Sequence, residues 1–299
     1  VVAGFRLAKR LGLSFGLLPF SNIGYSYSNT KALNSTDGST SVVKATNTYS
    51  GTGGLHQVYL GLGWSPFKGF AIGVNAAYLW GDYSRSVVNS YTDAYANTLS
   101  KYYTAEVHNY KLDFGMQYTQ KITKNDAITL GVTYGLGHKL SSDPKCQIIS
   151  TNAQTAVADT ATYSIGNGLE LPHSYGVGLM WNHANRWRVG ADYTLQKWSS
   201  VAYPKFDTST NSYELVSGQF ADRHKMTVGG EFCPDERSRS FFKRVHYRMG
   251  ASYATDYLKI KGQNGPKEYS VSAGFGIPIV NGYNNRSLLN ISAQWVRQD

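Results

Sequence analysis

Charge, proline and cysteine are all scarce in this sequence. Of its 299 residues only 16% are charged, whereas an ordinary soluble domain has roughly 25%. The 8 prolines leave room for long regular segments. The two cysteines, Cys146 and Cys233, are too few for a disulfide scaffold and show no metal-ligand spacing. We therefore expect no structural disulfide, no metal and no cofactor.

Long hydrophobic runs are absent as well. No segment approaches the roughly 18 apolar residues of a membrane-spanning helix, which excludes a helical membrane protein and leaves the closed barrel as the remaining membrane architecture. The net charge of +10 is scattered along the chain without a nucleic-acid-binding motif, so we expect no nucleic-acid partner. The chain begins without methionine or a signal peptide, which indicates a processed or partial chain.

Glycine (31 residues) and tyrosine (23 residues) are abundant and follow a period of two. Between residues 110 and 119, Tyr110, Leu112, Phe114, Met116 and Tyr118 alternate with Lys111, Asp113, Gly115, Gln117 and Thr119. The same alternation recurs in segments 58–64, 70–80, 128–137, 175–181, 189–195, 226–232, 245–253, 269–279 and 289–295. Together with segments 1–9 and 13–27, about twelve strands of barrel type are predicted.

A soluble β-sandwich also has alternating strands. Here, however, the segments exceed the usual length of roughly 5–6 residues, and the apolar faces repeatedly end in tyrosine or tryptophan, as in an interfacial girdle. The opposite faces carry glycine, serine, threonine and charge. We therefore predict an all-β fold, a transmembrane antiparallel up-and-down β-barrel.

Turn lengths predict the topology. Short connections near Arg10–Gly12, Pro66–Gly69, Thr123–Asp126, His183–Arg186, Pro234–Arg244 and Asn281–Arg286 alternate with long polar ones near Leu33–Asn47, Arg85–Leu99, Leu140–Thr162 and Tyr203–Tyr213. Short turns are periplasmic in outer-membrane barrels, so the first strand runs toward the periplasm and the last ends outside. We expect a single domain over 1–299, with one strand and any plug missing upstream, one strand missing downstream, and about fourteen strands in all.

Two segments, LSFGLLPFSNIGYSY (Leu13–Tyr27) and LPHSYGVGLMW (Leu171–Trp181), resemble the FadL-type family of outer-membrane transporters of long-chain fatty acids and other hydrophobic compounds, in its Bacteroidota form. The resemblance covers most of the chain in strand order. It implies a fourteen-stranded barrel, a plug in the lumen, and an inward kink in the third strand that opens the wall sideways. The plug itself is not in this sequence.

Pro19 lies in the middle of Leu13–Tyr27, which counts as the third strand. Proline cannot donate a ladder hydrogen bond and lipid supplies none, so freed backbone groups must face a cavity or a side chain. We predict a lateral portal at five consecutive residues, Leu18, Pro19, Phe20, Ser21 and Asn22. The alternative is a β-bulge that only adjusts strand twist.

Ionisable residues form the second candidate site, because they fall on the face opposite the apolar one. The predicted lumen-lining residues are Lys111, Asp113, Arg188, Asp192, Lys225, Glu231, His246, Arg248 and Asp256. In one interpretation they hold a plug or bind a carboxylate headgroup, with a two-pronged contact from Arg188 or Arg248. In the other they are the hydrated interior common to such barrels.

Catalytic signals are missing. A barrel phospholipase needs a histidine beside its serine, and only His173 and Ser174 are adjacent. Neighbours on a strand point to opposite faces and cannot form a nucleophile–base pair. We expect no enzyme and no catalytic residues.

The sequence thus predicts a passive channel in a Gram-negative outer membrane that takes up a hydrophobic, fatty-acid-like molecule and releases it through the barrel wall. Its expected partners are this molecule, outer-membrane lipid and lipopolysaccharide. The alternative is a non-transporting barrel subunit of a larger assembly or secretion complex, with other outer-membrane proteins or lipoproteins as partners.

Overall fold

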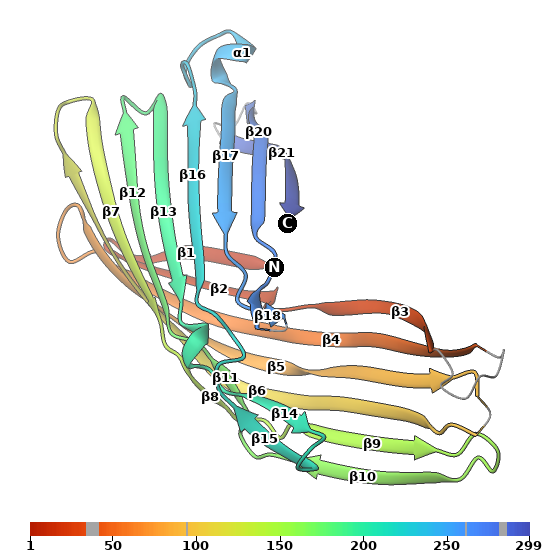
Figure 1. The fold of residues 1–299 in the computed structure, drawn as a ribbon. Helices are drawn as coiled ribbons and strands as arrows, with labels where there is room; N and C mark the ends of the chain where they lie inside the picture. The colour runs from red at the N-terminus through yellow and green to blue at the C-terminus, as the bar shows by residue number, and fades with distance from the viewer. Residues whose placement is uncertain (34–41, 94, 261, 281–285) are drawn as a thin grey trace.

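The computed structural model describes residues 1–33, 42–93, 95–260, 262–280 and 286–299, most of which lie in antiparallel strands. Twelve strands follow one another along a single sheet, which we call the wall, with β1 and β21 at its edges. They are β1 (Val2–Ala8), β2 (Leu11–Pro19), β4 (Val43–Trp64), β5 (Phe70–Tyr91), β6 (Thr98–Lys121), β7 (Asp126–Gly135), β12 (Ser174–His183), β13 (Trp187–Gln196), β16 (Arg223–Phe232), β17 (His246–Ala254), β20 (Glu268–Val280) and β21 (Arg286–Gln298). The wall curls strongly (Figure 1), and its up-and-down order confirms the predicted fold class.

The remaining elements are additions to the wall. Three strands extend the sheet: β3 (Ile23–Leu33) pairs with β4, and β9 (Lys145–Thr151) pairs with both β6 and β10 (Ala158–Ser164). Separate two-stranded pairs are β8 (His138–Leu140) with β11 (Leu169–Leu171), β14 (Tyr203–Asp207) with β15 (Ser212–Val216), and β18 (Lys259–Ile260) with β19 (Gln263–Asn264). The helices are η1 (Trp198–Ser200) and α1 (Phe241–Arg244). Within the described residues, no helix is long and apolar enough to cross a membrane.

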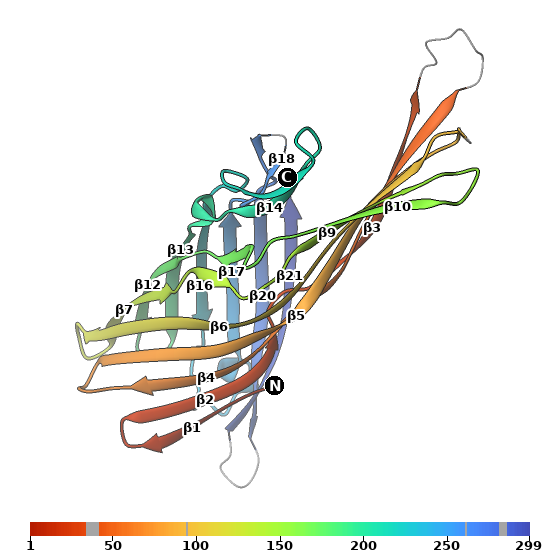
Figure 2. The same cartoon turned by 90° about the horizontal axis from the view of Figure 1, so that it is seen from below.

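Strands β4, β5 and β6 are 22, 22 and 24 residues long, and their far ends leave the wall as a projecting sheet (Figure 2). We call this sheet the wing. It consists of β3, residues 43–52 of β4, 82–91 of β5, 98–106 of β6, β9 and β10. Segments Arg85–Leu99 and Leu140–Thr162, expected as extracellular loops that continue the strands above the membrane, are largely strands of the wing. The Leu13–Tyr27 segment, expected as one strand, is divided between β2 and β3.

Glycines mark the line where the wing bends away from the wall. Gly53 and Gly81 have φ angles of 110° and 145°, which L side chains rarely adopt. A Cβ atom on Gly81 would lie 2.3 Å from the carbonyl oxygen of Gly54, and one on Gly54 would lie 2.4 Å from that of Ser21. Because only glycine allows backbones to approach so closely, these positions permit the bend.

The two faces of the wall differ in the way that the alternation predicted. One face exposes large apolar side chains, such as Leu60, Phe114 and Val228, with 51%, 44% and 54% of their surface accessible. We call the other the inner face, and it carries glycine, small polar and charged side chains. The connections at the wing end carry the inserted strands, whereas those at the opposite end are short except between β16 and β17, where α1 lies. Of the expected connections, 34–41 and 281–285 lie outside the described residues.

Candidate functional site

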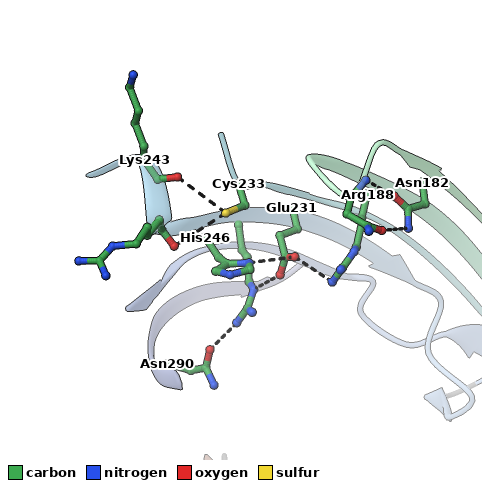
Figure 3. A network of polar contacts seen from close by, with 10 residues as sticks. Asn182, Arg188, Glu231, Cys233, Lys243, His246 and Asn290 are labelled. Atoms are coloured by element: carbon green, nitrogen blue, oxygen red, sulfur yellow. Dashed lines mark hydrogen bonds and ion pairs between the residues drawn. The ribbon is translucent and has the colours of Figure 1, made fainter. Parts of the chain in front are cut away.

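A network of charged side chains lies on the inner face near the short turns (Figure 3). Glu231 of β16 stands directly between Arg188 of β13 and Arg248 of β17 in the sheet. Its carboxylate accepts hydrogen bonds from Arg188 Nη1 at 3.2 Å and from Arg248 Nε at 2.6 Å, and His246 Nδ1 lies 3.2 Å from Oε1. Arg248 Nη1 also donates to Asn290 Oδ1 at 2.6 Å, which joins β21 to the network.

This arrangement fixes strand register and leaves a surplus of positive charge. Two guanidinium groups share one carboxylate, and charge-assisted hydrogen bonds of this kind are directional. The side chains of Arg188 and Arg248 keep 40% and 36% of their surface exposed. Arg188 and Glu231 line a hollow of about 540 Å³ on the inner face together with Asp192. Within this hollow a single guanidinium thus faces two carboxylates, and the exposed part of Arg248 lies outside it.

The other predicted lumen residues are spread along the same face. Lys111 forms an ion pair with Asp113 on β6, and Asp113 lines a second hollow of about 540 Å³. Lys225 shares a face with Glu231, since both lie at odd positions of β16. The structure thus joins Arg188, Glu231, His246 and Arg248 in one network, places Asp192 in the adjoining hollow and leaves the Lys111–Asp113 pair apart from them.

Asp256 does not lie on the wall. Strand β17 ends at Ala254, and Asp256 follows in the connection to β18, where its carboxylate accepts the backbone N–H of Tyr257 at 2.7 Å. The alternation that placed this residue stops with the strand, so a lumen-lining position for Asp256 stays a prediction.

The predicted portal falls on a break between β2 and β3. Residues Leu18 and Pro19 end β2, and Phe20, Ser21 and Asn22 lie outside any strand. Toward β4 the break is a bulge: the N–H groups of Phe20 and Ser21 both donate to the Leu55 oxygen, at 2.7 and 3.1 Å. The ladder to β4 therefore continues past Pro19.

The N–H group that Pro19 lacks would lie on the side of β2 that faces away from β4. Hydrogen-bonded pairs recur at every second residue of an antiparallel ladder, and Phe20 donates to β4 whereas Leu17 donates to Val1 on the opposite side. The backbone N–H groups of odd-numbered residues in β2 thus point away from β4. In the described chain no strand lies beside Pro19 on that side, so the opening in the wall stays a prediction.

A capping layer, which sequence patterns did not reveal, covers part of the inner face at the wing end. We call residues 197–222, with η1, β14 and β15, the cap. On one side, the ring centroids of Phe206 and Tyr163 are 5.2 Å apart, and those of Tyr213 and Tyr103 are 6.4 Å apart. The Lys101 ammonium lies over the ring of Phe206. Burial, with the nearby Tyr203 hydroxyl, raises the pKa of Tyr83. The cap is thus seated on the base of the wing.

The cap also reaches the far end of β17. Phe220 lies 5.6 Å from Tyr203 and 6.0 Å from Tyr257, and Trp198 stacks on Tyr257 at 4.6 Å. Leu79 of β5, on the inner face close to the wing, is fully buried. The only sequence signal for this layer was the aromatic content of a segment expected to be a loop.

A third group of polar side chains gathers where β16 ends. Ligand atoms of Cys233, Glu236 and His246 lie within 4.8 Å of one another. The Cys233 thiol faces the carbonyl oxygens of Lys243 and Arg244 at 3.9 and 3.8 Å, and burial, with nearby Glu236 and Glu231, raises its pKa. A protonated thiol that donates to these carbonyls accounts for the arrangement, so we assign no metal to it.

The curled antiparallel wall, its alternating faces and its long strand ends define the class of outer-membrane-type β-barrels with a FadL-like fold. The CymD monoaromatic hydrocarbon channel has a TM-score of 0.59 and 11% identity, covering 98% of this chain and 85% of that one. The Ralstonia pickettii toluene transporter TbuX scores 0.53 at 12% identity, with coverages of 99% and 80%. A Pseudomonas aeruginosa FadL homologue scores 0.52 at 13% identity, with coverages of 96% and 69%.

The family itself follows from the sequence. The model of the BamG family matches residues 1–298, and the chain belongs to this family. No curated protein sequence matches it. The expected likeness to FadL-type proteins is therefore confirmed for the fold, whereas the family name is a different one.

Proposed function

We propose that this chain is a non-transporting barrel subunit that holds other proteins at a Gram-negative outer membrane of the Bacteroidota type, without enzymatic activity. The observation that carries this proposal is the cap. Its aromatic layer extends from Tyr83 on β5 through Tyr203 and Phe220 to Tyr257 beyond β17. Packed side chains therefore cover part of the inner face at the wing end, where a molecule from outside would enter.

The chemistry of the inner face supports the same conclusion. The hollow beside Arg188 combines glycine, threonine and apolar residues with one guanidinium and the two carboxylates of Asp192 and Glu231. Two carboxylates beside one guanidinium disfavour a third carboxylate, such as that of a fatty acid. Large apolar side chains are instead exposed on the opposite face, where they suit lipid and the lipid portion of lipopolysaccharide.

The wing supplies a surface for partners. One of its faces carries Tyr25, Tyr27 and Tyr49, and the other carries serine and threonine, including a bond of 2.6 Å between Ser50 and Ser86. Such faces suit water and protein better than hydrocarbon. Other outer-membrane proteins or lipoproteins are therefore the proposed partners.

Passive uptake of a hydrophobic molecule with lateral exit is the second candidate. It is favoured by the break at Pro19, whose missing donor faces away from β4, and by the FadL-like fold of the hydrocarbon channels. In this alternative the residues from Leu18 to Asn22 border the exit.

One experiment separates the two candidates. Cells with the chain, without it, or with Pro19→Val are given radiolabelled toluene and a labelled long-chain fatty acid, and the chain is also extracted in mild detergent to measure its native mass. The subunit proposal predicts equal uptake in all three strains and a discrete complex heavier than the 33.0 kDa chain. Uptake that falls both without the chain and with Pro19→Val would establish transport instead.

A further inference from the structure

The wing has two edge strands, β3 and β10, and each is paired on one side only in the described chain. Strand β10 is the one without a lysine, since β3 carries Lys31. Strand β10 pairs with β9 over all seven residues from Ala158 to Ser164 in a single register. On its other side, no strand of the described chain pairs with it, although the β14–β15 hairpin comes close to it (Figure 1). The neighbouring hairpin touches β10 through a ring contact between Phe206 and Tyr163, not through backbone pairing.

The hydrogen-bond pattern identifies the free backbone groups. At one end of the ladder the N–H of Ile165 donates to the Pro144 oxygen at 3.1 Å, and at the other the N–H of Asn152 donates to the Val157 oxygen at 2.9 Å. Hydrogen-bonded pairs recur at every second residue, so the N–H and C=O groups of odd-numbered residues in β10 point toward β9. The N–H and C=O groups of Ala158, Thr160, Thr162 and Ser164 therefore point outward.

This edge lacks the features that keep exposed strands from pairing. Natural edges are blunted by proline, lysine, bulges or short length. In the cap, the five-residue strand β14 has Pro204 and Lys205. Strand β10 is longer, has no proline, lysine or bulge, and has one charged residue, Asp159.

We propose that the free edge of β10 binds an extended segment of another protein as an added β-strand. The proposal rests on the proposed function as a subunit of a complex. Addition of a strand draws its affinity from main-chain hydrogen bonds and its specificity from alternate side chains. Ala161 and Tyr163 would meet small or apolar residues of the segment, and Thr160 and Thr162 would meet polar ones.

A second copy of the chain is a less suitable occupant. Stable protein dimers bury roughly 1,200 Å² or more, and one seven-residue edge supplies only a small part of this area. A single added strand does not need an interface of this area, because it is bound by main-chain hydrogen bonds as well as by side-chain contacts.

Hydrogen exchange at single-residue resolution tests the proposal on the full chain, once purified in detergent and once in native membranes. In the purified chain, the amides of Ala158, Thr160, Thr162 and Ser164 should exchange fast and those of the odd residues slowly. In native membranes the four even amides should slow about tenfold or more, as expected for paired strands. Equal exchange of the even amides in both samples would overturn the proposal.

Two variants at one position sharpen the test. Thr162→Pro removes an outward donor without touching a bond to β9, and proline is tolerated at such edges, whereas Thr162→Ala keeps the donor. In native membranes, Thr162→Pro should restore fast exchange at Ala158 and Thr160, and Thr162→Ala should not. Equal protection in both variants would contradict strand addition.

The remaining outcomes distinguish the two proposals. A discrete complex whose β10 amides stay unprotected would refute strand addition and leave the subunit function standing. A chain that migrates alone and shows no protection would refute both. Cross-links from Thr160 that join two copies of the chain would replace the proposed partner with a second copy.

Discussion

The wall and the wing are built from the same strands, yet their side chains differ. Along β5, the wall section alternates Ile72, Val74 and Tyr78 with glycine, asparagine and alanine, whereas the wing section around Ser84 and Ser86 is polar on the corresponding face. The period of two is therefore a property of the strand alone. What distinguishes a surface for lipid from a surface for water is the residue type at each alternate position.

The largest expected effect lies on the inner face, where the wall borders the wing. Leu79→Ala removes a fully buried side chain and should lower the free energy of unfolding by about 2–5 kcal/mol, the range for large-to-small core changes. The matched control is Leu60→Ala on the exposed apolar face. Denaturant unfolding measures this loss, which we expect for Leu79→Ala alone. An equal loss in both variants would contradict the packing around Leu79.

A charge placed on the two sheets tests the comparison directly. Leu130→Arg puts a guanidinium on the exposed apolar face of the wall, which costs about 2–4 kcal/mol at mid-membrane. Ser28→Arg on the wing should cost almost nothing. The measurement is the yield of chain inserted in the membrane, and a similar loss for both substitutions would show that the wing also contacts lipid.

Substitution of a glycine on the line between wall and wing should have an intermediate effect on stability. Gly81→Ala places a Cβ atom 2.3 Å from a backbone oxygen at a positive φ and should cost about 1–3 kcal/mol through strain. Gly63→Ala on the same sheet meets no atom within 4 Å and serves as the control. Faster exchange of wing amides is expected for Gly81→Ala alone.

The smallest predicted effect is a pH dependence of the cap. Burial opposes ionisation of Asp222, but hydrogen bonds from Lys197 and from Ser199 prevail and lower its pKa to about 2. Because the folded pKa lies below the unfolded value near 3.9, this carboxylate stabilises the cap above about pH 4, and the stabilisation is lost as the pH falls toward 2.

Pepsin cleavage between pH 4 and pH 2 measures this loss. Cleavage within the cap of the unmodified chain, corrected for the activity of the protease, should rise toward pH 2. In Asp222→Asn the same cleavage should be faster at pH 4 and change little with pH. A parallel pH profile in both chains would show that another group controls the cap.

The features that alternation encodes could be predicted from the sequence, whereas those that depend on contacts between distant segments could not. The twelve strands of the wall follow from period two alone, and the same phase brings Arg188, Glu231 and Arg248 to one face. Polar segments such as Ala158–Ser164 looked like loops because their strand character arises from pairing with β9, not from apolar residues. The cap was missed because its aromatic partners, such as Tyr203 and Tyr83, are far apart in sequence.

Uninterrupted strands also have a mechanical consequence. Strand β5 runs for 22 residues, from Phe70 to Tyr91, and keeps one register with both β4 and β6. At about 3.3 Å per residue its length is roughly 70 Å, more than twice the apolar band of roughly 25 Å in such barrels. Because slippage would break many ladder bonds at once, a force applied to the wing is transmitted along β5 to the part of the same strand that lies in the wall.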